Sequence, residues 1–185
     1  VQTCALPISP RKFSADSARR KGAPLSSIEF WSLVDQVNKK EDQKSLFRGT
    51  LQRAIEIAVS AHKGQVDKGG SPYILHPLRV MLALESEEEK IIGVLHDVVE
   101  DSKWTFDILR AEGFSERIIE ALESVTKLEG EGYDAFIERA STNPLGRKVK
   151  IADLTDNMDM RRIGEPTDKD FERLKRYYWA LTFLQ

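Results

Sequence analysis

The stretch Gly93-Val-Leu-His-Asp-Val-Val-Glu-Asp101 places one imidazole and three carboxylates in a segment that otherwise has the pattern of a buried helix. At about 100° per residue, the polar groups of His96, Asp97, Glu100 and Asp101 fall within roughly 140° of arc, and apolar residues occupy the opposite side. Carboxylates this close repel one another unless a cation neutralises them, and a divalent metal ion is the usual one. The stretch therefore predicts a helix over 87–101 that carries part of a metal site.

Two further segments supply groups of the same kind. His76 precedes a proline that suits the first turn of a helix, and Asp153 and Asn157 are four residues apart, which places them on one helical face. Any one of these residues is more simply explained as a core histidine or a solvated acid. Taken together, two imidazoles and two carboxylates without a thiolate predict a site that suits Mn²⁺, Fe²⁺ or Zn²⁺ better than Ca²⁺.

The order of the motifs resembles the RelA/SpoT hydrolase domain, a branch of the HD superfamily. The matching motifs are Ala61-His-Lys-Gly-Gln65, Lys68-Gly-Gly-Ser-Pro-Tyr-Ile-Leu-His-Pro77, Leu95–Asp101, Val125-Thr-Lys-Leu128, and Lys150-Ile-Ala-Asp153 with Asn157-Met158. The resemblance runs from about Ala54 to Met158. It implies an all-α fold, a single HD-domain helical bundle, and an enzyme that removes the 3′-pyrophosphate from guanosine tetra- and pentaphosphate alarmones.

The resemblance also implies a role for each matching position. The metal ligands would be His76, His96, Asp97 and Asp153, and the family's usual ion is Mn²⁺. The catalytic pair would be Glu100 and Asp101, and Asn157 would face the nucleotide. His62 matches no ligand in this branch, so we expect it either in the wall of the pocket or as a capped histidine at a helix end.

The chemistry of these residue types is consistent with that assignment. A divalent ion lowers the pKa of its water towards about 7 and polarises a phosphoryl oxygen. Glu100, one helical turn beyond His96, could accept the proton of the water or orient it. Asp101 could do the same, and the sequence does not separate the two roles.

This chain departs from the family where the base is recognised. The family has an Arg-Lys pair, with the arginine stacked on guanine, where this chain has Asp67-Lys68. At the positions of residues 153–159 the family has Asp-Arg-Leu-His-Asn-Met-Arg, and this chain has acids in place of the histidine, at 156, and of the last arginine, at 159. We expect these acids to oppose a polyphosphate and Lys68 to be the remaining cation near the base or ribose. An arginine restored at 67 is then expected to raise activity on guanosine tetraphosphate.

Two alternatives to alarmone hydrolysis stay open. The first is an HD phosphohydrolase for a different nucleotide or phosphorylated metabolite, which the acidic replacements favour. The second, of another class, is a non-catalytic HD domain that binds a ligand or a partner. The presence of every expected ligand and of both catalytic acids argues against the second alternative.

The 185-residue chain is long enough for one domain with a substantial core. Residues 27–185 are expected to form the HD hydrolase domain, and residues 1–26 a disordered segment whose first eight residues look like a translated sequencing adaptor. Periodicity predicts helices over 27–38, 50–62, 76–85, 87–101, 105–112, 115–126, 132–142, 145–162 and 168–184. Thr105 and Ser115 are expected as N-caps.

Composition limits the classes of partner. Residues 1–25 hold five Lys or Arg and one acid, so the rest of the chain is clearly acidic and a poor candidate for non-specific nucleic-acid binding. No apolar run approaches the 18 residues that a membrane span needs. Cys4 is the single cysteine, which excludes a disulfide framework and favours a cytoplasmic protein. The expected partner is a small-molecule nucleotide, and the sequence does not determine the oligomeric state.

Overall fold

The computed structural model describes residues 26, 28–34, 36 and 48–185. The N-terminal part and the part that runs on to Gln185 are separate units. Residues 28–34 and 36 are helical, within the predicted helix over 27–38. The expectations of disorder over 1–26 and of an adaptor origin for 1–8 concern residues outside the described ones, Ser26 aside.

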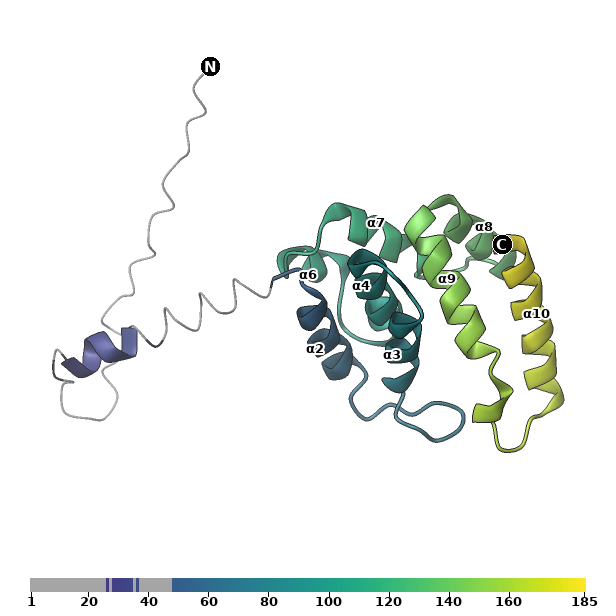
Figure 1. Ribbon diagram of the computed structural model, residues 1–185, viewed down its shortest axis with the longest axis horizontal. Coiled ribbons are helices and arrows are strands. Elements are labelled where there is room, and N and C mark those ends of the chain that lie inside the picture. The colour runs from purple at the N-terminus through teal and green to yellow at the C-terminus, as the bar shows by residue number, and fades with distance from the viewer. Residues whose placement is uncertain (1–25, 27, 35, 37–47) are drawn as a thin grey trace, which may run out of the picture. The chain divides into compact units, whose positions relative to one another are not determined.

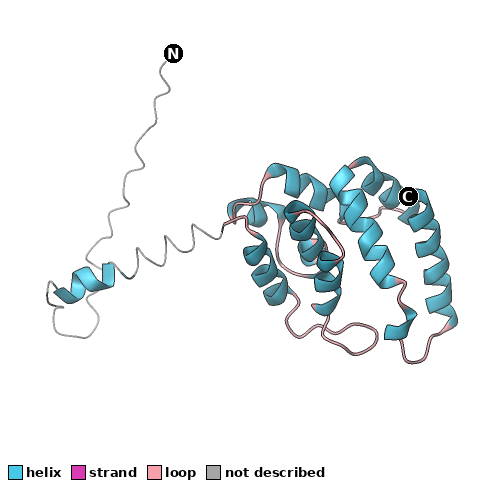
Figure 2. Ribbon diagram, viewed as in Figure 1, coloured by secondary structure: helices cyan, strands magenta, loops and turns pink. Residues whose placement is uncertain are grey.

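The C-terminal unit is built from helices (Figures 1 and 2). They are α2 (Leu51–Ala61), α3 (Leu75–Leu82), α4 (Glu87–Leu95), α5 (Val98–Asp101), α6 (Phe106–Ala111), α7 (Glu116–Val125), α8 (Tyr133–Thr142), α9 (Pro144–Asn157), the 3₁₀ helix η2 (Met160–Arg162) and α10 (Asp168–Leu184). The described residues contain no strand beyond one isolated bridge, between Val66 and Pro72. The all-α prediction is confirmed.

Side-chain caps explain why several helices begin where they do. Thr105 accepts a hydrogen bond from the Ile108 amide and Ser115 from the Ile118 amide, which confirms both predicted caps. Ser86 and Glu89 form a reciprocal capping box at the start of α4. Each cap satisfies an amide that would otherwise lack a partner, so the first turn of each helix is stabilised locally.

Two predicted helices are interrupted. The helix expected over 87–101 ends at Leu95, and α5 begins at Val98. His96 Nδ1 lies 2.8 Å from the Gly93 carbonyl oxygen, which is the acceptor that a regular helix offers to the Asp97 amide. The chain therefore turns at His96 and Asp97, and Glu100 does not follow His96 on one straight helix face.

The helix expected over 145–162 ends at Asn157 instead. Asp159 then caps η2 through the Arg161 amide, so the chain changes direction between Asn157 and Met160. This turn brings Arg162 back towards α3, which matters for the site below.

Helix α4 lies at the centre of the larger hydrophobic core and contacts α2, α3, α7 and α9 (Figure 1). Its residues Ile91, Ile92, Val94 and Leu95 are almost completely buried. A second cluster joins α8, α9 and α10. Burying one such aliphatic side chain contributes roughly 1.5–3 kcal/mol, so the core anchors α4 directly before His96. Among the described residues, no helix combines the length and the apolar character of a membrane span.

Candidate metal centre and nucleotide pocket

Four of the sequence-predicted residues lie together between α3, the end of α4 and α9. His76 Nε2 is 3.6 Å from Asp97 Oδ2 and 3.2 Å from Asp153 Oδ1. His96 Nε2 is 3.1 Å from Asp97 Oδ2 and 3.6 Å from Asp153 Oδ1. His76, His96 and Asp97 each offer a ligand atom within 4.8 Å of the others. The packing of α3 against α9 thus joins residues that are 77 positions apart in the chain.

Neighbouring polar groups fix the two carboxylates. The Tyr73 hydroxyl donates to Asp97 Oδ2 at 2.6 Å. Lys150 donates to Asp153 Oδ2 at 2.8 Å, and the Asn157 amide donates to Asp153 Oδ1 at 2.6 Å. Asp153 and Asn157 therefore share a helical face, as predicted, and Asn157 contacts the carboxylate directly.

The electrostatics of the cluster favour a positive charge at its centre. His96 is 2% exposed, and its Nε2 is buried without a hydrogen bond although carboxylate oxygens lie close. Burial alone would lower the pKa of His96, but the charges of Asp97 and Asp153 outweigh burial and raise that pKa well above its usual value. A mixed nitrogen and oxygen donor set with an unpartnered imidazole nitrogen is a cluster that could hold a divalent metal ion.

Glu100 and Asp101, the expected catalytic pair, follow the cluster on α5. Glu100 Oε1 accepts a hydrogen bond of 2.5 Å from the Lys127 amide. Burial, reinforced by the charge of Asp97, raises the pKa of both carboxyls above their usual values. A raised pKa makes each group a better proton acceptor near neutral pH than an exposed carboxylate.

A cavity of about 200 Å³ opens beside His76. It is bordered by the loop after α2, by the turn after α9 and by α10; its lining includes Val66, Asp67, Lys68, Gly69, Tyr73, His76, Asn157, Asp159, Arg162, Ile163 and Arg173. The structure therefore brings the loop and the turn together at one cavity, beside His76 of the cluster.

The cations of this pocket differ from the expectation. Lys68 does line it, but its ammonium lies 3.3 Å from Asp170 Oδ1, and its side chain is largely exposed. Arg162 and Arg173 line the same cavity. The prediction that Lys68 would be the remaining cation is therefore wrong, because the turn after α9 and the start of α10 contribute two arginines.

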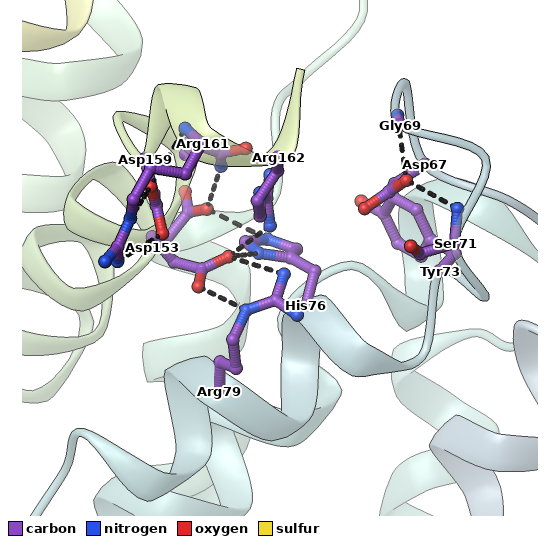
Figure 3. A network of polar contacts seen from close by, with 12 residues as sticks. Asp67, Gly69, Ser71, Tyr73, His76, Arg79, Asp153, Asp159, Arg161 and Arg162 are labelled. Atoms are coloured by element: carbon purple, nitrogen blue, oxygen red, sulfur yellow. Dashed lines mark hydrogen bonds and ion pairs between the residues drawn. The ribbon is translucent and has the colours of Figure 1, made fainter. Parts of the chain in front are cut away.

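The three acids near the pocket each have partners within the protein, and their effect on a polyphosphate stays a prediction; Figure 3 shows the contacts of Asp67 and Asp159. Asp67 Oδ1 accepts from the Gly69 and Ser71 amides, both at 2.9 Å, and so holds the loop. Asp159 pairs with Arg161 at 2.8 Å. An arginine at 67 would lose both loop hydrogen bonds, so that substitution would not test base stacking alone.

Asp156 is the third of these acids, and it contacts a member of the cluster. Its Oδ2 lies 2.6 Å from His76 Nδ1, and both Arg79 and Arg162 pair with it. Burial would raise the pKa of Asp156, but the hydrogen bonds from His76 and Arg79 outweigh burial and hold the pKa well below its usual range. The acid is thus ionised and neutralised by its neighbours.

His62 lies outside the cluster and does not line the cavity, but its ring contacts that of Tyr73. It is buried, its Nδ1 is 2.8 Å from Gln65 Oε1, and its ring centroid lies 5.0 Å from that of Tyr73. This position fits the expectation of a histidine at a helix end, since His62 is the C-cap residue of α2.

Sequence reasoning missed Lys150, Arg79, Arg162 and Arg173 as parts of the site. Lys150 could have been found, since it lies three residues before Asp153 and so shares its helical face. Nothing local indicates that Arg79 and Arg162 converge on Asp156, because that contact depends on the turn after α9.

Known proteins of similar sequence include enzymes that act on guanosine nucleotides. The chain is 32% identical over 145 residues to a guanosine-3′,5′-bis(diphosphate) 3′-pyrophosphohydrolase of Aquifex aeolicus, which covers 69% of the chain and 21% of the relative. It is 33% identical over 169 residues to a probable GTP pyrophosphokinase of Mycobacterium leprae, covering 84% of the chain and 21% of the relative. The chain therefore spans about a fifth of the length of these relatives.

A solved structure is similar to this chain in fold. It is described as a metazoan ortholog of SpoT that hydrolyses ppGpp, and it matches with a TM-score of 0.62 at 19% identity. The match covers 72% of this chain and 84% of that one. No protein-family model matches the chain.

Proposed function

Because the chain carries an HD domain of the RelA/SpoT type, we propose that it is a metal-dependent phosphohydrolase that removes the 3′-pyrophosphate from guanosine tetra- or pentaphosphate. One observation carries this proposal. Two imidazoles and two carboxylates converge next to a cavity lined by three cationic side chains. A phosphorylated substrate needs both features, since the scissile phosphate must reach the metal while the rest of the molecule is held beside it.

The proposed ligands are His76, His96, Asp97 and Asp153, and the proposed ion is Mn²⁺. Imidazole nitrogen with carboxylate oxygen suits Mn²⁺ as well as Fe²⁺ or Zn²⁺. When bound, a divalent ion supplies a nucleophilic hydroxide near neutral pH and polarises a phosphoryl oxygen. The Tyr73 hydroxyl and the Lys150 ammonium hold Asp97 and Asp153 in place by the contacts described above.

Glu100 is the proposed proton acceptor, and Asp101 its neighbour that orients water. The hydrogen bond from the Lys127 amide fixes one oxygen of Glu100, which leaves the other oxygen to receive a proton. The raised pKa of Glu100 brings its basicity closer to the operating pH.

The nucleotide is proposed to enter the cavity beside His76 with one end only. The cavity is smaller than the roughly 300 Å³ typical of pockets that enclose a whole small molecule. The base or ribose would fit inside, with Asn157 and Lys68 at its edge, while the phosphates remain at the metal and meet Arg162 or Arg173. We further propose the cytoplasm as the location of this reaction, because one cysteine builds no disulfide framework.

A second candidate function is hydrolysis of another phosphorylated nucleotide. It is favoured by Asp67, whose carboxylate holds the loop at the place where the family has a guanidinium to stack on guanine. The two candidates share the metal chemistry and differ only in how the base is recognised.

The test is metal analysis of the purified protein followed by a screen over guanine and adenine 3′-pyrophosphates and other nucleotides, in which an added inorganic pyrophosphatase converts any released pyrophosphate to phosphate for detection. Glu100→Gln should keep the metal and lose most turnover, whereas His96→Ala should lose both. Selective release from guanine 3′-pyrophosphates supports the first candidate, and release without guanine preference supports the second. A wild-type protein that binds Mn²⁺ and releases neither pyrophosphate nor phosphate from any of them would contradict both.

A further inference from the structure

Asp156 is the meeting point of three structural elements. From α9, its Oδ2 lies 2.6 Å from His76 Nδ1 in α3. Arg79 of α3 donates Nε to Oδ1 at 2.6 Å and Nη2 to Oδ2 at 3.1 Å. Arg162 of η2 donates Nη1 to Oδ2 at 2.6 Å. Figure 3 shows Arg79 and Arg162 approaching from either side of His76.

The contact with Asp156 determines which nitrogen of His76 is available to bind a metal ion. An imidazole ring that donates Nδ1–H to a carboxylate directs its Nε2 lone pair to the other side. That other side is the cluster, where Nε2 lies 3.2 Å from Asp153 Oδ1. His96 has the same arrangement with a different acceptor, because its Nδ1 is 2.8 Å from the Gly93 carbonyl oxygen.

The two arginines explain how a carboxylate can occupy this place. An unpaired Asp156 would repel Asp97, Asp153 and any phosphate in the neighbouring cavity. Arg79 and Arg162 instead surround it, and its side chain is only 12% exposed. The acid at 156, where the family reads histidine, is thus a paired and oriented group.

We propose that Asp156 is a positioning residue that fixes the His76 ring so that Nε2 faces the metal, with Arg79 and Arg162 holding the carboxylate in place. This inference rests on the metal site of the proposed function. Arg162 also lines the cavity, so the same contact joins the nucleotide pocket to the ligand set.

Three variants test the role. Asp156→Leu removes the acceptor, Asp156→Asn keeps a neutral acceptor oxygen, and Asp159→Asn is the matched control. Asp159 is an acid at the same end of α9, it pairs with Arg161, and asparagine retains its capping role at η2. The first readout is the Nδ1–H proton of His76 by ¹⁵N-edited NMR of the metal-free protein. The second is the Kd for Mn²⁺ by calorimetry.

The wild type and Asp159→Asn should show a His76 Nδ1–H proton protected from exchange, and Asp156→Leu should lose it. Loss of a group that hydrogen-bonds to a metal ligand and orients it weakens metal binding about 10- to 100-fold. We expect that range for Asp156→Leu, a smaller loss for Asp156→Asn, and wild-type affinity for Asp159→Asn.

The measurements distinguish a failure of the positioning role of Asp156 from a failure of the metal site. A protected Nδ1–H proton in Asp156→Asn and Asp156→Leu alike, or Mn²⁺ affinity in both equal to the control, would overturn the role of Asp156. A wild-type protein that shows the proton but binds no divalent ion would instead overturn the metal site. If Asp156→Leu does not fold, the Kd for Mn²⁺ of Asp156→Asn against that of Asp159→Asn decides the question, and equal affinity would overturn the role of Asp156.

Discussion

Gly69 lies where the loop after α2 approaches the turn after α9, and replacing it with alanine should push the two apart. A Cβ at this position would lie 2.2 Å from the Arg162 carbonyl oxygen, which is a backbone atom that cannot rotate away. Ordinary contact begins at 3.4 Å, so the loop must retreat by about 1 Å. Overpacking of this size costs about 1–3 kcal/mol, which lowers the Tm of a domain of this length by roughly 3–10 °C.

The same displacement should impair nucleotide binding, because Gly69 and Arg162 both line the cavity. We expect Gly69→Ala to raise KM for the nucleotide more than it lowers kcat. The assays are thermal unfolding and steady-state release of pyrophosphate. The matched control is Gly164→Ala, since a Cβ there meets nothing within 4 Å, and its free energy of unfolding should stay within about 0.5 kcal/mol of wild type. A Gly69→Ala protein with wild-type Tm and KM would refute the close packing of loop and turn.

Three further predictions concern helix positioning and metal. Lys148 and the Ser86 amide hold the pKa of Glu89 at about 2, so its contribution to stability is present above its usual pKa of 4.5 and is lost as pH falls towards 2. Glu89→Gln should therefore cost ~1–2 kcal/mol at pH 7 and clearly less at pH 3 in denaturant unfolding, and an equal cost at both pH values would contradict the ion pair. Arg139 donates to the Thr126 carbonyl and to Glu131. These two contacts hold the segment between them, and the Lys127 amide of that segment donates to Glu100. Arg139→Met should lower kcat several-fold with unchanged Mn²⁺ affinity, and a change in affinity alone would show that the arginine acts elsewhere. Removal of the metal by a chelator should lower the Tm, since free Mn²⁺ at about 100 times its Kd stabilises by roughly 2.7 kcal/mol. The same chelator should leave the Tm of His96→Ala unchanged.

The helices were largely predictable because their determinants are local. Apolar spacing and the caps at Thr105 and Ser115 lie within a few residues of the turns that they stabilise. The predicted helix over 87–101 was wrong at His96 and Asp97, where a side chain competes for a backbone carbonyl. Propensity alone does not report that competition, since the histidine is oriented by the residues packed around it.

The candidate site likewise has some features with local determinants and others that depend on long-range contacts. The residue pattern alone predicted the helical fold, the candidate ligands, and the shared face of Asp153 and Asn157. The charge balance of Asp156, in contrast, depends on long-range packing, because Arg79 of α3 and Arg162 of η2 neutralise its carboxylate. The physical reason is range: helix periodicity acts over a few residues, whereas the charge balance around an acid depends on which distant side chains the packing of α3, α9 and η2 brings within hydrogen-bonding distance.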